Sequence, residues 1–358
     1  MALATFLFYF RKLVHILIEM IGIGVGVGVM AACNLLVYGS GNCELAAVIE
    51  AEVSRLLQVE SEEVKIFARG YILENSCLAL YKRFTPLKEQ LGQVKKGGLY
   101  EYFYDGAEKV ERQELRMESS AHKEALEECV QIGIKRMRAE VITLVLIGES
   151  NETGLFWDFT EEHPSKLTYK ALDEVLYKLG KRNHIKFDVI MDIPIWHGIE
   201  VPHALAKNPY IKSLFMYERQ TPLHIFPVAC WIQRTYLEQK NYLEVLYKYF
   251  PGYYVTLDQE KWKECMDSWR RYWDSPDHIM WRQFYENYKA VVLYTNPEKP
   301  TQYAKLYFRQ QCIPEQRETI SEQELQDYLV EMYHTTFDDK NIKLWLTDFK
   351  TCVDYYKL

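Results

Sequence analysis

Short apolar runs that alternate with amphipathic segments constrain the fold of this chain more than any other feature. The run EVITLVLIGE at 140–149 is continuous and rich in β-branched residues. Such runs are typical of strands buried on both faces of a parallel sheet. The segment before it, at 119–137, has helical spacing, and Ser119 with a following glutamate predicts an N-terminal cap. A helix therefore leads into a buried strand.

The same alternation extends over most of the first 250 residues. Strands are also predicted at 33–42, 64–72, 186–195 and 212–218, helices at 43–59, 167–181 (ended by Gly180), 200–208 and 229–250, and a hairpin at 99–116. Strands that alternate with helices predict an α/β domain with a largely parallel sheet and helices on both faces.

The pattern changes after Pro251-Gly252. Residues 258–290 have helical spacing and carry a stripe of tryptophan and tyrosine, which is typical of a packed helix surface. A strand follows within 290–300, and an amphipathic helix is predicted at 320–336 with a Ser321/Glu324 capping box. The C-terminal region is therefore expected to be mostly helical.

Composition excludes several classes of function. The net charge of −7 argues against nucleic acid as a partner. The eight cysteines are scattered, with no C-x-x-C pair and no histidine at metal-ligand spacing, so neither a zinc site nor a disulfide scaffold is predicted. Most of them are expected to be buried thiols. The GSGN turn at 39–42 lacks the rest of a phosphate-binding motif, and no cofactor is predicted.

The N-terminal segment at 1–33 is apolar, with Arg11-Lys12 between two hydrophobic runs. Three interpretations are open. The segment is a membrane anchor or targeting sequence, a signal that ends in a lipid-modified Cys33, or a hydrophobic arm that docks on this fold or on a partner. His15 and Glu19 interrupt the second run, and a strand begins at once after it, which weakens both membrane interpretations.

Taken in order, these segments resemble the clostripain-like cysteine peptidases (family C11), a branch of the caspase-like fold. The resemblance covers roughly residues 34–240 and is specific in order and spacing rather than in motif identity. Its best stretch is FDVIMDIPIWHGIEV at 187–201, where Asp192 falls on the aspartate that precedes the family's Ala-Cys. The resemblance implies a caspase-like three-layer α/β sandwich with a mostly parallel sheet.

The catalytic positions of that family do not match this chain. By the resemblance, the nucleophilic cysteine falls at Pro194 and the histidine falls near Glu149. Proline has no nucleophile, and a glutamate does not replace an imidazole that exchanges a proton near neutral pH. The resemblance therefore implies the fold and argues against the activity.

A rearranged dyad of His197 and Cys230 is the enzyme alternative. In "IPIWHG" and "IFPVAC" an apolar run precedes His-Gly and Ala-Cys, as in a caspase-type dyad. The strand predicted at 212–218 lies between the two in the sequence, whereas the family's two catalytic strands follow one another. The order is therefore wrong for a standard dyad.

The sequence predicts three parts: a hydrophobic segment at 1–33, a clostripain-like α/β domain at 34–250, and an aromatic-rich, mostly helical region at 251–358. The expected function is that of a non-catalytic pseudopeptidase, a structural or protein-binding subunit associated with a bacterial envelope or organelle membrane. A third alternative is a peptide receptor that keeps the old substrate cleft. There an acidic rim of Glu149, Glu152 and Asp192 would favour basic ligands.

Overall fold

The computed structural model describes residues 33–294, except for a long gap at 73–97 and several shorter ones. These gaps are at 44, 57, 60, 62, 73–97, 107–108, 115–118, 152–153, 159–164, 193–199, 218–224, 239, 251 and 275–277. By its internal contacts the chain divides into two compact units, residues 1–31 and residues 32–358, and the described residues all belong to the second. The helix predicted at 320–336 lies outside the described residues.

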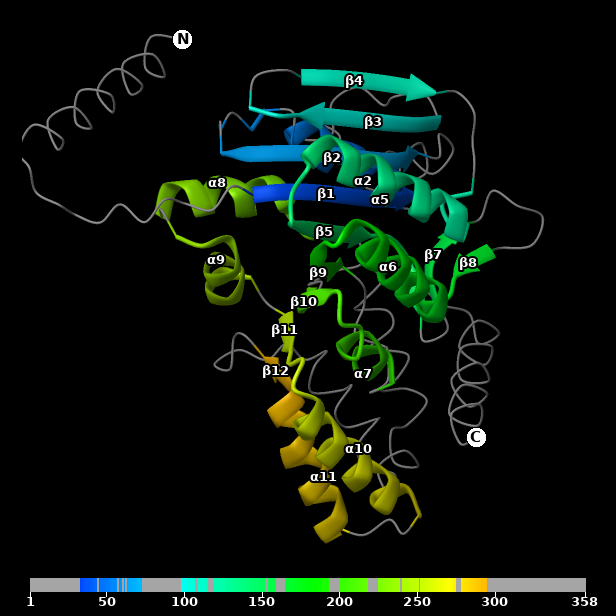
Figure 1. Cartoon of the computed structure of the whole chain (residues 1–358), viewed down its shortest axis with the longest axis vertical. Helices are drawn as coiled ribbons and strands as arrows, with labels where there is room; N and C mark the ends of the chain where they lie inside the picture. The colour runs from blue at the N-terminus through cyan, green and yellow to red at the C-terminus, as the bar shows by residue number, and fades with distance from the viewer. Residues whose placement is uncertain are drawn as a thin grey trace, which may run out of the picture. The chain divides into compact units, whose positions relative to one another are not determined.

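A nine-stranded sheet forms the centre of the second unit, and Figure 1 shows its strands in order from β4 at the top to β12 at the bottom. The strands are β1 (Cys33–Gly41), β2 (Val64–Ile72), β3 (Gly98–Tyr104), β4 (Lys109–Glu114), β5 (Val141–Ile147), β9 (Lys186–Asp192), β10 (Ile211–Tyr217), β11 (Gly252–Val255) and β12 (Val292–Tyr294). A separate small sheet contains β6 (Ser150–Asn151), β7 (Gly154–Asp158) and β8 (Ser165–Leu167).

The five central strands β2, β1, β5, β9 and β10 are all parallel to their neighbours. Antiparallel strands extend the sheet at both sides, β3 and β4 beyond β2, and β11 and β12 beyond β10. The parallel core explains the apolar runs of the sequence, because strands of this kind are covered on both faces.

Helices cover both faces of the sheet, and each face has its own buried cluster. One cluster joins the sheet to α5 (Lys123–Met137), α6 (Tyr169–Asn183), α7 (Glu200–Ala206), α10 (Gln259–Asp274) and α11 (His278–Val291). The other joins it to α2 (Ala46–Leu56), α8 (Val228–Glu238) and α9 (Tyr242–Tyr249). This arrangement confirms the three-layer α/β fold class that the sequence predicts.

The C-terminal region beyond residue 250 also contributes to the sheet. The sequence places a boundary at 250, yet β11 pairs with β10 from Tyr217 at Gly252 to Leu214 at Val255. The helices α10 and α11 follow as a pair, as the helical spacing of 258–290 predicts, and Trp262 of the aromatic stripe is completely buried. The sheet therefore continues from the predicted α/β domain into the region after it.

Three local predictions are wrong: the N-terminal cap of α5, the end of α6, and the single helix at 229–250. The N-cap residue of α5 is His122, whose side chain makes no capping bond, while Ser119 and Ser120 make tertiary contacts instead. Gly180 does not end α6, which continues to Asn183. A Cβ at Gly180 would lie 2.5 Å from Tyr210 Cβ, so the glycine permits close packing rather than a helix end.

The helix predicted at 229–250 is two helices. The first, α8, ends at Glu238, and α9 begins at Tyr242 after a new N-cap at Asn241. The Asn241 side chain accepts a hydrogen bond from the backbone N–H of Leu243 at 2.9 Å. Asparagine is among the preferred N-cap residues, so this cap explains the break in an otherwise continuous apolar pattern.

Most of the described cysteines are buried thiols, as the sequence predicts. Cys33, Cys43, Cys129 and Cys265 are buried, and Cys230 is exposed. Cys33 is the first residue of β1, and its backbone N–H donates to the carbonyl of Glu63. Its thiol therefore packs inside the fold described here.

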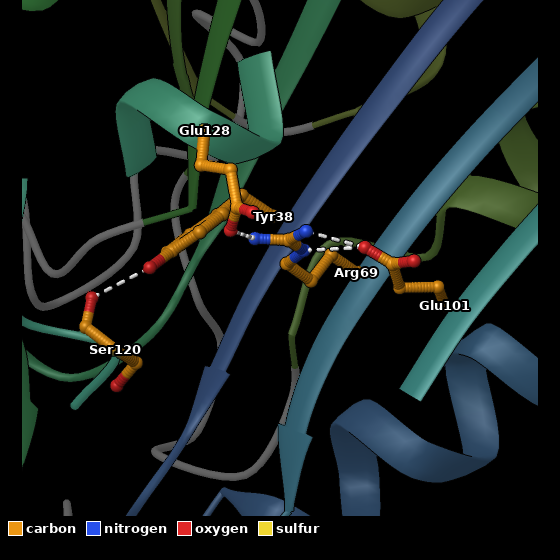
Figure 2. A network of polar contacts seen from close by, with 5 residues as sticks. All are labelled: Tyr38, Arg69, Glu101, Ser120 and Glu128. Carbon is orange, nitrogen blue, oxygen red and sulfur yellow. Dashed lines mark hydrogen bonds and ion pairs between the residues drawn. The ribbon is translucent and has the colours of Figure 1, made fainter. Parts of the chain in front are cut away.

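A buried ion network ties β2 to β3 and α5 (Figure 2). Arg69 of β2 has a side chain that is 3% exposed, and it pairs with Glu101 of β3 and with Glu128 of α5. The Glu101 side chain is 12% exposed and the Glu128 side chain 58% exposed. Arg69 therefore compensates one nearly buried carboxylate and one that faces water.

We predict that Arg69→Met lowers the free energy of unfolding by about 3–5 kcal/mol, because Glu101 would keep a buried charge without its partner. Glu128→Gln is the control, and it should cost no more than about 1 kcal/mol because its carboxylate is already solvated. Urea unfolding followed by far-UV circular dichroism measures both. Equal losses in the two variants would contradict this account of the network.

Candidate functional site

The carboxyl ends of the parallel strands form the edge at which open α/β sheets usually bind ligands. In this sheet β1 lies between β2 and β5, so the order of the strands reverses beside β1. β5 and β9 are neighbours, and Ile147 at the end of β5 pairs with Asp192 at the end of β9. Residues that follow these strands therefore come together at one place, which we call the carboxyl edge.

Four buried polar residues lie at the end of β1, and we call them the β1-end cluster: Ser40, Asn42, Ser120 and Asp158. The Asn42 amide donates to Asp158 Oδ2 at 2.6 Å, and the backbone N–H of Ser120 donates to the same oxygen at 3.2 Å. The hydroxyls of Ser40 and Ser120 lie 2.7 Å apart. These residues come from three separate segments, so their mutual bonds hold the segments together.

Phe156 of β7 fills the space beside this cluster. Its side chain is completely buried, and its ring centroid lies 4.9 Å from that of Tyr38 in β1. Its backbone φ of 57° is in the left-handed region, which is unfavourable for a residue with a bulky side chain. The packing around the ring therefore holds a strained backbone in place, and the small sheet covers the carboxyl edge next to β1.

Tyr38 of β1 contacts both Phe156 of the small sheet and Ser120, which lies just before α5. Its hydroxyl donates to the carbonyl of Ser120 at 2.7 Å, a contact drawn in Figure 2. Burial is the largest cause that raises the pKa of the Tyr38 phenol well above its ordinary value. The phenol is therefore a neutral hydrogen-bond donor in the core.

Two buried carboxylates hold the start of α8. Glu52 Oε1 of α2 accepts from the backbone N–H of Ala229, in the first turn of α8, at 2.7 Å, and Asp192 Oδ2 accepts from the N–H of Phe226, two residues before α8, at 2.7 Å. The first N–H groups of a helix have no partner within the helix, and negative charge is favourable there. Asp192 and Glu52 therefore fix α8 against the sheet.

Burial is the largest cause that raises the pKa of Glu52, and the nearby charge of Asp192 raises it further. The Ala229 N–H and Arg55 act in the opposite direction, because they stabilise the ionised carboxylate. Arg55 Nη1 lies 3.2 Å from Glu52 Oε2. The net result is a carboxyl group that is harder to ionise in the folded state than in water.

The structure describes only some of the residues that the sequence assigns to a site. Glu149 is partly buried just after β5, and its carbonyl accepts from the N–H of Trp157 at 3.2 Å. Asp192 is completely buried rather than part of an exposed rim. Glu152, Pro194 and His197 lie outside the described residues, so their placement stays a prediction.

Cys230 is exposed on α8, and no described residue forms a hydrogen bond with its thiol. The strand expected between His197 and Cys230 exists as β10, which lies between β9 and β11 in the sheet. A strand therefore does separate His197 from Cys230 in the sequence, and this order differs from that of a standard caspase-type dyad. Among the described residues no group of three or more His, Cys, Asp or Glu side chains is arranged to hold a metal ion.

Sequence reasoning missed Glu52, Ser120 and Asp158. A signal existed for Glu52, because position 52 is three residues after Ile49 and four before Leu56, on the apolar stripe of its helix. A glutamate on such a stripe requires a buried partner. No local sequence pattern indicated Ser120 or Asp158, because their hydrogen-bond partners come from distant segments.

No protein-family model and no curated protein sequence matches the chain. Solved structures do resemble it. A secreted C11 cysteine protease from Bacteroides thetaiotaomicron, in complex with an irreversible peptide inhibitor, aligns with a TM-score of 0.48 and 10% identity over 72% of this chain and 82% of the protease. An inactive zymogen C11 protease from Parabacteroides distasonis aligns with a TM-score of 0.47 and 11% identity over 74% and 83%. Both are C11 cysteine proteases, the family that the sequence of this chain resembles.

We predict that Gly148→Ala lowers the free energy of unfolding by about 1–3 kcal/mol through overpacking of the carboxyl edge. The added Cβ would lie 2.7 Å from Phe156 Cδ1 and 3.0 Å from Ser40 Cβ. Gly70→Ala in β2 is the matched control, because the nearest atoms there lie 3.8 Å away. Urea unfolding of both variants measures the difference, and a Gly148→Ala protein as stable as the control would show that the cover is loosely packed.

We predict that Glu52→Gln gains stability relative to the wild type as pH rises from the ordinary glutamate value of 4.5. Because the pKa is raised in the folded state, the folded protein retains a proton that the unfolded chain has released, so wild-type stability falls with rising pH in this window. Glutamine keeps an oxygen for the Ala229 N–H and does not titrate.

Urea unfolding from pH 4.5 to 8 tests this difference, with Glu244→Gln on the exposed face of α9 as the control. A stability difference between Glu52→Gln and wild type that is constant over the whole range would contradict the assignment.

Proposed function

We propose that this protein is a non-catalytic relative of the clostripain-like peptidases that acts as a structural or protein-binding subunit at a membrane. The observation that carries the proposal is Glu149, which follows β5 at the carboxyl edge, where the resemblance places the catalytic histidine. A carboxylate has no second ring nitrogen and its ordinary pKa is near 4, so it does not serve as the base of a thiol nucleophile as imidazole does.

The cysteines support the same conclusion. A thiol nucleophile must be accessible and must ionise readily. Burial is the largest cause that raises the pKa of Cys33 and of Cys129 to about 12, so both remain protonated thiols at neutral pH. Cys43 and Cys265 are also buried. These four cysteines pack the core rather than carry chemistry.

The polar groups at the carboxyl edge serve the fold. Asp192, which the resemblance places in the substrate cleft, is bonded just before the start of α8, and the β1-end cluster is bonded within itself. Asp192 is completely buried, so a peptide receptor that reads basic side chains through it would first have to expose its carboxylate. The binding surface of the proposed subunit is therefore expected elsewhere on the fold.

The membrane part of the proposal rests on the sequence of residues 1–33. None of the helices that the structure describes is both long and apolar enough to cross a membrane. The segment 1–32 lies outside the described residues, so its apolar composition alone supports an anchor, a targeting sequence or a docking arm.

A cysteine peptidase with a His197/Cys230 dyad is the second candidate. One observation favours it: Cys230 is exposed, unlike the other cysteines that the structure describes. Exposure is necessary for a nucleophile, but an exposed thiol without a described base is also an ordinary surface cysteine.

We predict that the purified full chain does not hydrolyse fluorogenic peptides with Arg or Lys before the cleavage site, and that Cys230→Ser changes nothing. A thiol-reactive dye should label Cys230 at the same rate, within about threefold, as a thiol moved one turn along α8 in the Cys230→Ser, Gln233→Cys double variant. Hydrolysis that disappears in Cys230→Ser, or labelling of Cys230 more than tenfold faster than of the moved thiol, would establish the peptidase and end the pseudopeptidase proposal.

A further inference from the structure

We propose that the edge of the sheet opposite the candidate site binds an anionic membrane surface. Six exposed basic residues define this basic edge: Lys135, Arg138, Lys181, Arg182, Lys186 and Lys212. The inference rests on the proposed membrane association and adds to it a specific face and a specific lipid chemistry.

The topology brings these residues together. Because β5, β9 and β10 are parallel neighbours, all three begin at the same edge of the sheet. α5 ends at Met137 just before β5 begins at Val141, and α6 ends at Asn183 just before β9 begins at Lys186. The two helices therefore present their last turns at the edge where the strands start.

The charge at this edge differs from that of the whole chain. The chain carries −7, yet the six residues of the basic edge all face solvent, and two described acids at the same edge, Glu63 before β2 and Glu140 before β5, are exposed there as well. Within the described part of the chain none of the six forms an ion pair. Farther along the same two helices the lysines do pair with acids, Lys123 with Glu174 and Lys178 with Glu127. Burial is the largest cause that raises the pKa of Asp188, and Lys212 acts in the opposite direction through its charge. Lys181 Nζ lies 5.7 Å from the centroid of the Tyr177 ring, but all six basic groups remain exposed to solvent.

Helix ends alone do not account for this charge. Basic residues are favourable in the last turn of a helix, because they interact with its negative end. That reason applies to Lys135, Lys181 and Arg182. It does not apply to Lys186 and Lys212, which are the first residue of β9 and the second of β10. Their positions at the start of two buried strands extend the positive charge across the sheet.

The start of β1 indicates the partner. Cys33 begins β1 at this same edge, and residue 32 of the apolar segment is bonded directly to it. Adjacent strands lie about 4.8 Å apart, so β9 and β10 start roughly 10–15 Å from β1. The covalent bond at Cys33 therefore tethers these strand starts to any membrane that the apolar segment enters. Anionic headgroups attract lysine and arginine within a Debye length of about 8 Å in physiological salt, so the attraction acts once the basic edge faces that membrane.

Sedimentation of the full-length protein with vesicles tests the inference. Vesicles of phosphatidylcholine alone are compared with vesicles containing about 30% phosphatidylglycerol, which supply the anionic surface potential. Lys186→Glu with Lys212→Glu is the test variant. Lys170→Glu with Arg271→Glu is the matched control, since both residues are exposed, lie on α6 and α10 away from the edge, and give the same change in charge.

We expect the test variant to bind the anionic vesicles at least about 30-fold more weakly than wild type, because each basic residue near such a surface contributes roughly a fivefold factor. The control variant should lose less than about threefold, and wild-type binding to anionic vesicles should weaken in 0.5 M salt, about where the Debye length falls below 5 Å. Binding to neutral vesicles should be the same in all three proteins.

Two results overturn the inference in distinguishable ways. If wild type and the test variant bind both kinds of vesicle equally, the basic edge does not contact lipid, while the membrane association of the proposed function stands. If wild type binds neither kind, the membrane association fails as well. Binding to duplex RNA or DNA that the test variant loses, without binding to anionic vesicles, would replace the lipid partner with nucleic acid.

Discussion

Burial of five parallel strands on both faces is the constraint on which the rest of this structure depends. The side chains of strands such as β5 are apolar on both faces of the sheet, so these strands are stable only between two layers of helices. Parallel strands also need a crossover between each pair. Once the helices fill both faces, the two edges of the sheet remain the places where chain ends, loops and polar groups gather. The chemistry of this protein is therefore divided between a carboxyl edge and an amino edge.

At the carboxyl edge several buried polar groups bond to one another, although the Oδ1 atom of Asn42 accepts no hydrogen bond from a described residue. Asp158 accepts from Asn42 and from Ser120, Asp192 accepts from Phe226, and Glu52 accepts from Ala229. A buried polar group without a partner costs about 1–3 kcal/mol, so each of these bonds removes a penalty and joins distant segments. A catalytic site needs some polar groups that are kept for the substrate. Asp158, Asp192 and Glu52 are committed to the fold, which supports the proposed non-catalytic role.

The sequence predicts the fold where the signal is local. The continuous run of β5, the Asp105-Gly106 turn between β3 and β4, and the order of strands and helices all follow from apolar spacing and turn chemistry. It fails where a residue serves a distant contact. Gly180 looks like a helix end but makes room for Tyr210, and Ser119 looks like a cap but its hydroxyl contacts Ser165. The candidate site depends on such long-range contacts, so little of it was predictable beyond Glu149 and Asp192.

The two edges differ in a way that bears on function. Asp192, Glu52 and Asp158 at the carboxyl edge are buried and bonded next to α8 or within the β1-end cluster, whereas the basic groups of the basic edge are exposed and form no ion pair with a described residue. The helix dipole accounts for Lys135, Lys181 and Arg182, but exposed charge at the start of a strand contributes little to stability, so folding alone gives no reason for Lys186 and Lys212. Long-range attraction of an anionic surface does give a reason, because it sums over all the basic groups of the edge. The proposed role of a non-catalytic subunit at a membrane is consistent with this difference, because the buried acids stabilise the fold while the exposed basic groups can contact an anionic surface.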